Sequence, residues 1–435
     1  MDYTGKQFAI FTLGCKLNFS ESSEMAQLLE KEGLSRVDFK ELADLYIIHS
    51  CSVTEQSDKK SRNIIRQAIR RNPKAMVIVA GCYAQLKPDA IAQIEGVDFI
   101  LGTHEKYNLT SRLGDLSKNE YPQIFTSKPK EIKNFHKAYS FGDRTRSFLK
   151  VQDGCNYYCT YCTIPYARGI SRNDTIENTV AEAKNIAAKG IKEVILTGVN
   201  IGDFGQSTNE SFFDLVKALD EVEGIERFRI SSIEPNLITD EIIEFVAQSK
   251  RFAPHFHIPL QSGSDDVLSL MKRRYKREVF AHRVEKIKLT MPHAFIGVDM
   301  IAGTNGETNE FFIDSYNFIR DLDVSQIHAF PYSERANTQA LKIEGKVDVP
   351  VRKERCQQLI NLSERKLRHF YQSQLGRECK ALFEEQQNEG KMFGFTDNYV
   401  RVELPYNKEL VNQVCQVRLE KVNEQNHVEV TVIPE

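Results

Sequence analysis

Three cysteines stand close together in the segment Cys155-Asn-Tyr-Tyr-Cys159-Thr-Tyr-Cys162 and are the residues best suited to do chemistry. A loop with this spacing can present three thiolates to one centre. Thiolates are ligands of zinc ions and of iron–sulfur clusters. The spacing therefore predicts a metal centre held by Cys155, Cys159 and Cys162.

The kind of metal follows from what surrounds this segment. A structural zinc site takes four protein ligands, and the nearest candidates downstream, His255 and Cys356, are far along the chain. A four-iron cluster held by three thiolates keeps one iron open, and an open metal position can bind a substrate or cofactor. We therefore favour a four-iron cluster over zinc and over three cysteines with no shared role.

A second set of cysteines, Cys15, Cys51 and Cys82, lies near the start of the chain. Each follows an apolar run that we expect to be a strand. These runs cover residues 8–12, 45–49 and 76–80. The carboxyl ends of parallel strands meet at one crevice of a doubly wound sheet, so the three thiols can converge. The pattern predicts a second metal centre.

The last three cysteines, Cys356, Cys379 and Cys415, have no cysteine at short spacing, and we interpret them as small buried apolar residues. Residues 1–6 contain no apolar signal region, which predicts a cytoplasmic protein whose thiols stay reduced. No apolar run reaches the roughly 18 residues of a membrane span. We therefore expect neither disulfides nor a membrane partner.

The elements that must position these cysteines form an α/β pattern over residues 1–126. A fourth strand is expected at 99–102, with helices at 21–32 and 56–71. Continuous apolar strands between helices predict a doubly wound parallel sheet covered on both faces. The polar residues 127–144 are interpreted as a linker.

A second α/β series over residues 145–372 carries the cysteine loop after its first strand. Its expected strands are 148–152, 193–197, 227–231, 255–259, 295–299 and 326–330, with helices such as 175–189 and 309–322. Six strand–helix units are too few for an eight-stranded barrel, so we expect a partial, open barrel. Catalytic loops lie at the carboxyl ends of barrel strands, where this cysteine loop falls.

The end of the chain changes character after a long charged helix expected at 351–374. Short strands at 381–385, 392–396, 400–404, 413–422 and 427–432 predict a small β-barrel over residues 373–435. From Phe370 onward there are 7 Lys and Arg residues against 11 Asp and Glu. This balance argues against strong electrostatic binding of RNA by the C-terminal barrel.

The formal net charge of −2 excludes a chain that holds nucleic acid by bulk charge. Two local basic stretches, 59–71 and 271–277, could contact phosphates or could be ordinary solvated helix faces. Arg168 and Arg172 follow the cysteine loop. We expect them either to contact the substrate or to pair with carboxylates.

The segment from Cys155 to Cys162 at the end of the first barrel strand resembles the signature of radical S-adenosylmethionine enzymes. The resemblance implies that the open iron chelates S-adenosylmethionine, which is cleaved to methionine and a 5′-deoxyadenosyl radical. It also implies a set of cofactor-binding residues: Tyr161 near the adenine, Thr197, Gly198 and Asn200 near the methionine, and in addition Glu234 and Gln261.

Segments 12–18, 50–54 and 81–85 resemble the N-terminal domain of methylthiotransferases, which uses its three cysteines for an auxiliary 4Fe-4S cluster. Segments 162–169, 258–264, 271–275 and 330–333 continue the likeness, and the C-terminal barrel resembles the RNA-binding TRAM domain. Residues 49–50, 304–307 and 334–337 depart from the usual pattern. None of them is a cysteine of either set.

The resemblance implies an enzyme with two 4Fe-4S clusters that uses S-adenosylmethionine twice, for a methyl group and for a radical. Segments 14–18 and 231–235 are most similar to the branch that modifies position 2 of N6-threonylcarbamoyladenosine next to the tRNA anticodon. Isopentenyladenosine in tRNA and a ribosomal-protein aspartate are the alternatives within the family. A non-catalytic iron–sulfur protein that binds RNA is the alternative outside it. The expected partners are tRNA and an electron donor of flavodoxin or ferredoxin type, and the sulfur donor is left open.

Overall fold

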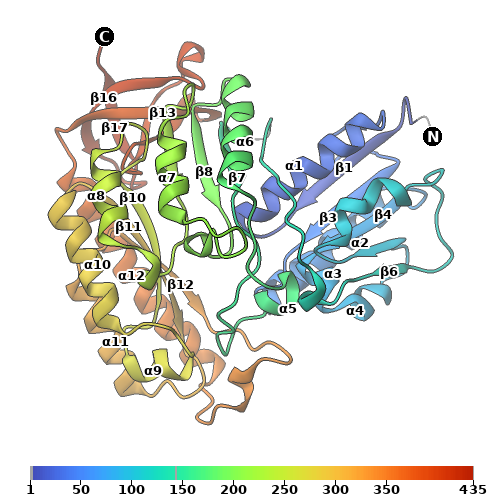
Figure 1. Ribbon diagram of the computed structural model, residues 1–435, viewed down its shortest axis with the longest axis horizontal. Coiled ribbons are helices and arrows are strands. Elements are labelled where there is room, and N and C mark those ends of the chain that lie inside the picture. The colour runs from blue at the N-terminus through green and yellow to red at the C-terminus, as the bar shows by residue number, and fades with distance from the viewer. Residues whose placement is uncertain (1–2, 143–144, 435) are drawn as a thin grey trace.

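A six-stranded parallel sheet forms the first part of the chain in the computed structural model, which describes residues 3–142 and 145–434. Its order is β2-β1-β3-β4-β5-β6 (Figure 1). The strands are β1 (Gln7–Thr12), β2 (Ser35–Arg36), β3 (Leu45–Ser50), β4 (Met76–Gly81), β5 (Phe99–Leu101) and β6 (Gln123–Phe125). β3 and β4 are buried along their whole length, as a sheet covered on both faces requires. The predicted doubly wound sheet is confirmed, with β2 and β6 as short additions.

Helices cover both faces of this sheet. They are α1 (Lys16–Lys31), α2 (Glu55–Arg71), α3 (Cys82–Leu86) and α4 (Pro88–Ala92), with 3₁₀ segments η1 (Glu105–Arg112) and η2 (Pro129–Glu131). α2 begins where expected because the Thr54 side chain accepts a hydrogen bond from the Ser57 amide. α1 begins directly after Cys15, earlier than the predicted residue 21. No side chain caps its start, so the sequence carried no signal for that boundary.

The predicted linker lies against the barrel. Within its described part, the Ser140 amide donates to the Phe148 carbonyl at 3.1 Å, and the Lys150 amide donates to the Ala138 carbonyl at 2.9 Å. Residues 143–144 of the predicted linker lie outside the described residues. This pairing gives β7 a neighbour on its outer edge.

Six parallel strands form the central partial barrel as two three-stranded sheets, β7-β8-β9 and β10-β11-β12. The strands are β7 (Arg146–Lys150), β8 (Glu193–Thr197), β9 (Arg227–Ile230), β10 (His255–Gln261), β11 (Phe295–Ala302) and β12 (Gln326–Pro331). Isolated parallel bridges, such as Ser232 with His257, connect the two sheets. The predicted open barrel is therefore confirmed.

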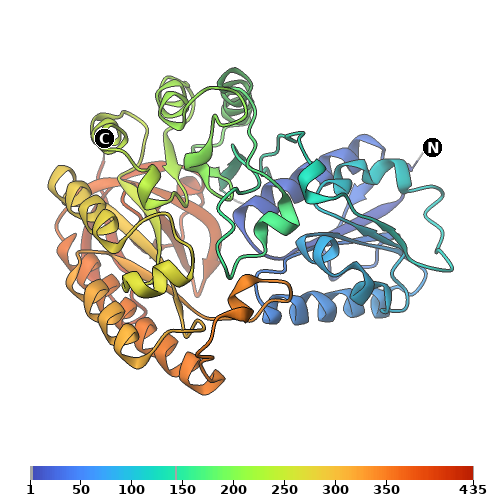
Figure 2. The same cartoon turned by 60° about the horizontal axis from the view of Figure 1, so that its bottom comes forward.

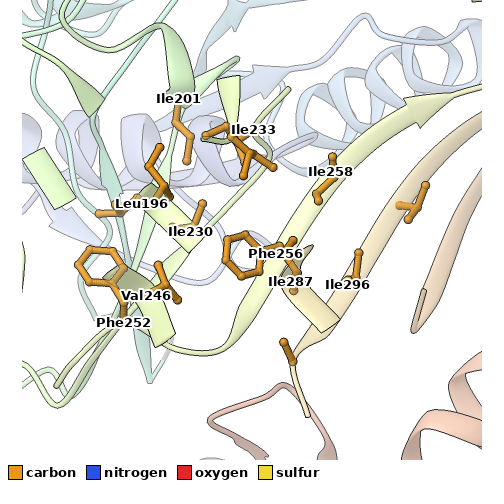
Figure 3. Packing of buried hydrophobic residues seen from close by; sticks show 14 of the residues in the cluster. Leu196, Ile201, Ile230, Ile233, Val246, Phe252, Phe256, Ile258, Ile287 and Ile296 are labelled. Carbon is orange, nitrogen blue, oxygen red and sulfur yellow. The ribbon is translucent and has the colours of Figure 1, made fainter. Parts of the chain in front are cut away.

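Helices surround the outside of this barrel. They are α6 (Ile176–Ala188), α7 (Phe212–Asp220), α8 (Asp240–Gln248), α10 (Arg277–Thr290), α11 (Asn309–Asp321) and α12 (Val349–Ser373). The loops after the strands contain the short helix α9 (Asp265–Leu270) and the 3₁₀ segments η3 (Ile201–Asp203), η4 (Pro235–Leu237) and η5 (Gln339–Lys342), and α5 (Ile164–Arg168), after the cysteine loop, packs against α3 of the N-terminal domain. Strand residues such as Leu196, Phe256 and Ile296 pack against Val246 and Ile287 of these helices (Figure 3). Because side chains alternate along a strand, the intervening residues face the inside of the barrel.

The C-terminal strands close into a small barrel in the order β13-β14-β15-β17-β16, as predicted. They are β13 (Glu378–Asn388), β14 (Lys391–Thr396), β15 (Arg401–Pro405), β16 (Val414–Val422) and β17 (Val428–Val432), with η6 (Lys408–Leu410). Arg227 donates to the Phe395 carbonyl at 2.7 Å, and Arg229 donates to the Asp397 carbonyl at 3.0 Å. Both arginines also pair with buried Glu193. The small barrel is thereby attached to the amino end of the central strands, opposite the cysteine loop.

The N-terminal sheet lies beside the central barrel, with the beginning of α1 next to β7 (Figures 1 and 2). The rings of Phe19 and Phe148 meet there at a centroid distance of 6.4 Å. In the described part of the chain, no helix has both the length and the apolar character needed to cross a membrane.

Candidate metal centres

Cys155, Cys159 and Cys162, here called the loop trio, lie in the loop after β7. Three N–H groups point at their sulfur atoms: the Tyr157 amide at 3.4 Å from Cys155 Sγ, the Ile164 amide at 3.4 Å from Cys162 Sγ, and Arg273 Nη1 at 3.0 Å from Cys159 Sγ. Such donors stabilise sulfur that carries negative charge. The loop is therefore arranged for thiolates.

The three thiols of the loop trio are close enough to affect one another. Burial raises the pKa of Cys162 to about 12, and the Cys159 and Cys155 thiols add to that effect. Deprotonation of these buried thiols costs free energy unless a cation lies nearby. The irons of a cluster would supply that positive charge.

Cys15, Cys51 and Cys82, here called the N-terminal trio, lie at the carboxyl ends of β1, β3 and β4. Gly14 has φ +105°, and a Cβ atom there would stand 2.9 Å from Cys51 Cβ. Gly81 has φ +101°, and a Cβ atom there would stand 2.7 Å from the Ser50 carbonyl oxygen. Glycine is required at both positions because the three strand ends approach so closely.

Electrostatics also place the N-terminal trio together. Burial, together with the nearby Cys82 and Cys15 thiols, raises the pKa of Cys51 to about 12. In residues 3–142 and 145–434, no three His, Cys, Asp or Glu side chains converge tightly enough to hold one metal ion. A four-iron cluster is larger than one ion and takes one thiolate on each iron, so it suits three thiols that share a region without touching.

One buried arginine accompanies each trio. Arg168 lowers the pKa values of Cys51 and Cys82, in opposition to the burial that raises them. Arg273 does the same for Cys159. Each trio therefore has a buried guanidinium that favours its thiolates.

Arg168 and Arg172 pair with carboxylates in this structure, which is one of the two roles that the sequence allowed for them. Arg168 is 1% exposed, and Arg172 is 6% exposed. Arg172 Nη2 donates to Asp153 Oδ2 at 2.8 Å, and its Nε and Nη1 donate to backbone carbonyls. Both guanidiniums are buried, and both Nη atoms of each donate to acceptors within the protein.

A buried ion network around Arg168 joins the N-terminal sheet to the central barrel. Arg168 Nη1 donates at 3.0 Å to Glu21 Oε1 and to Asp153 Oδ1, the latter two residues before Cys155. Lys106 and Lys150 lie 2.6 and 3.0 Å from the Glu21 carboxylate. Burial alone would raise the pKa of Glu21, but the three cations hold it well below its usual range.

The same network reaches the backbone beside the N-terminal trio. Arg168 Nη2 donates to Asn18 Oδ1 at 2.7 Å. Asn18 Nδ2 in turn donates to the Leu13 carbonyl at 2.7 Å and the Ser50 carbonyl at 3.3 Å, beside Cys15 and Cys51 respectively. Arg168 therefore contacts supports of both trios.

A second connection runs from the loop after β12 to the loop that follows Cys51. Arg335 Nη2 donates to Ser52 Oγ at 2.7 Å and to Asp58 Oδ2 at 2.9 Å, and Arg335 is 3% exposed. Arg335 belongs to the segment 334–337 that departs from the family pattern. Although this segment departs from the family pattern, its Arg335 forms a buried ion pair with Asp58 that joins the central barrel to the N-terminal domain.

The residues expected to bind the methionine part of S-adenosylmethionine lie at the end of β8. Gln152 Oε1 accepts hydrogen bonds from the Val199 and Asn200 amides, both at 2.9 Å, and Gln152 Nε2 donates to the Gly154 carbonyl at 2.7 Å. Thr197 and Gly198 are thereby held beside the loop trio. Neither polar atom of the buried Asn200 amide has a hydrogen-bond partner among the described residues.

Glu234, Tyr161 and Gln261 lie around the same region. Glu234 forms an ion pair with Arg273 Nη2, and Arg273 Nη1 lies 3.5 Å from the Tyr161 hydroxyl. Gln261 is the last residue of β10 and has φ +68°. Arg273 thus connects Glu234 and Tyr161 to Cys159.

Two sequence families match the chain. Residues 7–102 match the Uncharacterized protein family UPF0004, and residues 149–319 match the Radical SAM superfamily. A threonylcarbamoyladenosine tRNA methylthiotransferase of Bacillus subtilis is 40% identical over 95% of this chain and 93% of its own length. The Thermotoga maritima protein of the same name is 36% identical over 97% and 96%. A tRNA-2-methylthio-N(6)-dimethylallyladenosine synthase of Clostridium botulinum is 30% identical over 96% and 95%.

This chain belongs to the radical S-adenosylmethionine methylthiotransferase family. The methylthiotransferase also shares its fold with the radical S-adenosylmethionine methyltransferase TsrM of Kitasatospora setae. That likeness has a TM-score of 0.56 at 15% identity and covers 76% of this chain and 74% of TsrM. It concerns the fold alone.

Family membership assigns two 4Fe-4S clusters and S-adenosylmethionine to the methylthiotransferase. The donor set fits these groups, because each trio offers three thiols, a buried arginine and no competing disulfide. The unpartnered amide of Asn200 fits a polar ligand at the end of β8. The remaining cysteines, Cys356, Cys379 and Cys415, pack in or against the apolar cores of the two barrels.

Sequence reasoning missed three residues of the methylthiotransferase. Arg273 lies in the basic stretch 271–277 that we considered for RNA, yet its side chain is 3% exposed and bonded to Cys159. Gln152 and Glu21 carried no local signal beyond their place on a strand and a helix. Each acts on a partner that is distant in the chain.

The Arg168 network predicts a large effect on stability. Arg168→Met should lower the free energy of unfolding by about 3 kcal/mol, because it removes the principal cation beside the buried Glu21 carboxylate. Urea unfolding followed by circular dichroism measures this change. Arg320→Met is the matched control, since Arg320 pairs with Asp321 on the surface, and it should shift the value by at most about 0.5 kcal/mol. Equal losses in the two variants would contradict the prediction.

Proposed function

We propose that this enzyme attaches a methylthio group to position 2 of N6-threonylcarbamoyladenosine in tRNA. The observation that carries the proposal is the sequence identity to relatives, which is higher for threonylcarbamoyladenosine enzymes than for a dimethylallyladenosine synthase. Five threonylcarbamoyladenosine enzymes are 31–40% identical over 91–97% of the chain, whereas a dimethylallyladenosine synthase is 30% identical over a similar length. Isopentenyladenosine and a ribosomal-protein aspartate are the alternative substrates.

The mechanism assigns one role to each trio. Cys155, Cys159 and Cys162 would hold the cluster with the open iron, and the N-terminal trio would hold the auxiliary cluster. S-adenosylmethionine supplies a methyl group for sulfur and a 5′-deoxyadenosyl radical for hydrogen abstraction from an unactivated carbon, which side chains cannot achieve by acid–base catalysis. The protein positions these groups, and Arg273 offsets the charge of Cys159.

Other residues would orient the cofactor. In this proposal Thr197, Gly198 and Asn200 bind its methionine part, with Gln152 holding their backbone against the cysteine loop. Tyr161, Glu234 and Gln261 complete the cofactor site.

Each proposed domain has one of these roles. Residues 1–126 carry the auxiliary cluster, residues 145–372 carry the radical chemistry, and residues 373–435 form the TRAM-like barrel. The excess of acidic residues in that barrel favours recognition of tRNA by shape or by a local patch. A flavodoxin- or ferredoxin-type protein is the proposed electron donor.

Nucleoside analysis of tRNA tests this proposal. A strain lacking the gene should lose 2-methylthio-N6-threonylcarbamoyladenosine and accumulate the unmodified threonylcarbamoyladenosine, as measured by liquid chromatography and mass spectrometry. Expression of the wild-type chain should restore the product. Loss of the methylthio isopentenyl nucleoside instead, or no change in any tRNA nucleoside, would overturn the proposed substrate.

A further inference from the structure

The loop after β12 contacts the N-terminal domain beside one of the two trios. Arg335 Nη2 donates to Ser52 Oγ at 2.7 Å and to Asp58 Oδ2 at 2.9 Å. Ser52 directly follows Cys51 of the N-terminal trio. In Figure 2 this loop, coloured orange, lies next to the beginning of α2. Arg335 therefore attaches the loop to the stretch of chain that carries Cys51.

The same loop contacts the loop trio a few residues later. The Ala340 amide donates to the Thr160 carbonyl at 2.9 Å, and Thr160 directly follows Cys159. The Ala340 carbonyl accepts a hydrogen bond from Asn305 Nδ2 at 2.9 Å, so both backbone groups of this residue are bonded. We call residues 335–340 the bridging segment, because they extend from a neighbour of one trio to a neighbour of the other.

The bridging segment is held in one conformation by burial and by hydrogen bonds. Arg335, Thr338 and Ala340 are buried, and Thr338 Oγ1 donates to the Arg335 carbonyl at 2.7 Å. Asn337 has φ +64°, a left-handed conformation that asparagine adopts more readily than most residues with a Cβ atom. Segments with buried contacts and bonded backbone open rarely, so this one can act as a fixed spacer.

The ion pair between Arg335 and Asp58 adds to a charge balance that the N-terminal domain already has. Lys87, from the same domain as Asp58, lies 3.0 Å from Asp58 Oδ2, and Ser52 Oγ donates to Asp58 Oδ1 at 2.7 Å. Arg335 brings a second cation from the central barrel to this buried carboxylate. The added ion pair therefore stabilises the docked arrangement of the two domains.

Two connections between the domains lie on opposite faces of the N-terminal sheet. The Arg168 network binds Glu21 of α1, which packs on one face of the sheet. Arg335 binds Asp58 of α2, which packs on the other face. Relative motion is the default for domains that meet through polar contacts. Attachment on both faces restrains a rotation that the Arg168 network alone would leave free.

We propose that Arg335 is a positioning residue that sets the distance between the two trios. This inference rests on the proposed function, which gives radical formation to the loop trio and the methylthio group to the N-terminal trio. The substrate carbon that loses hydrogen at one centre must then lie within bonding reach of the sulfur at the other. A misplacement of about 1 Å in such a geometry costs up to about a hundredfold in rate.

Without Arg335, cleavage of S-adenosylmethionine should continue while fewer cleavages end in product. The 5′-deoxyadenosyl radical still takes a hydrogen atom from the substrate carbon. The resulting substrate radical, if it meets no sulfur, takes an electron from dithionite, the reductant of the assay, and a proton from water. This regenerates the substrate and leaves 5′-deoxyadenosine as the record of an unproductive cycle.

The test measures the ratio of methylthio nucleoside to 5′-deoxyadenosine in a single turnover of the reduced holoenzyme with substrate tRNA. The ratio should fall about tenfold to a hundredfold in Arg335→Met, as expected for a misplacement of about 1 Å. 5′-Deoxyadenosine should form at a rate close to that of the wild type, because the loop trio keeps its thiols and Arg273. Arg335→Lys should give an intermediate ratio, since an ammonium group keeps the charge but lacks the planar fork of donors.

Arg355→Met is the matched control for a loss of stability. Arg355 is also a buried arginine of the central domain, but it pairs with Glu307 of the same domain at 2.7 Å. Its loss should lower the free energy of unfolding as the loss of Arg335 does, and it should leave the product ratio unchanged. An equal fall of the ratio in both variants would show that Arg335 acts through stability alone and would overturn the inference.

Pulsed electron paramagnetic resonance gives a readout that needs no turnover. With both clusters reduced to their paramagnetic state, the magnetic interaction between them depends on the distance between the trios. Wild type and Arg355→Met should show the same interaction, whereas Arg335→Met should show a weaker or more widely distributed one. Iron analysis checks that both clusters are present in each variant.

An unchanged product ratio or an unchanged magnetic interaction in Arg335→Met would also overturn the inference. If Arg335→Met loses its iron, Arg335→Lys decides the question, and a wild-type ratio in that variant contradicts the proposed role. The proposed function has a separate readout. It fails if the wild type forms no methylthio product on tRNA that carries N6-threonylcarbamoyladenosine, whatever the variants do.

Discussion

Cys51→Ala should separate the two uses of S-adenosylmethionine. We expect reduced enzyme to continue forming 5′-deoxyadenosine, because the loop trio keeps its three thiols and Arg273. Methylthio product should fall below detection, since Cys51 belongs to the N-terminal trio that would hold the auxiliary cluster. Anaerobic iron analysis should drop from roughly eight irons per chain to roughly four.

Cys356→Ala is the matched control for this experiment. Cys356 is 6% exposed and Cys51 is 7% exposed, so the two substitutions remove equally buried thiols. Cys356 packs in the apolar core of the central barrel, and its loss should leave both iron content and product formation near wild type. Normal product from Cys51→Ala would show that the N-terminal trio holds no auxiliary cluster.

Cys159→Ala should abolish the cleavage of S-adenosylmethionine. Cys159 lies in the middle of the loop trio, and its sulfur accepts the hydrogen bond from Arg273. Loss of this ligand should remove the cluster with the open iron, so 5′-deoxyadenosine and methylthio product should both disappear. Chromatography of reduced reaction mixtures measures the nucleoside, and iron analysis should again give about four irons per chain.

The pair of variants distinguishes the two centres. Iron content alone should fall equally in both, while only Cys51→Ala retains 5′-deoxyadenosine. If Cys159→Ala formed that nucleoside and Cys51→Ala did not, the roles assigned to the two trios would have to be exchanged.

Local spacing and strand order carried the predictions that the fold confirms. The loop trio is contained in a segment of eight residues, so its shared centre depends on little beyond the loop itself. The N-terminal trio is spread along the chain, but parallel strands place their carboxyl ends at one edge, and this rule was enough to bring the three cysteines together. The open barrel and the closing β-barrel followed from strand number and length in the same way.

Only the tertiary structure decided which partner each charged side chain takes. Arg168 is 147 residues from Glu21, and nothing in the sequence near either residue indicates that they meet. Arg168, Arg172 and Arg273 read equally well as contacts for RNA until packing buries them against Glu21, Asp153 and Glu234. Periodicity and local spacing determine the strands and the thiolate loops, whereas ion pairs depend on the docking of one domain against another, which is a long-range property of the folded chain.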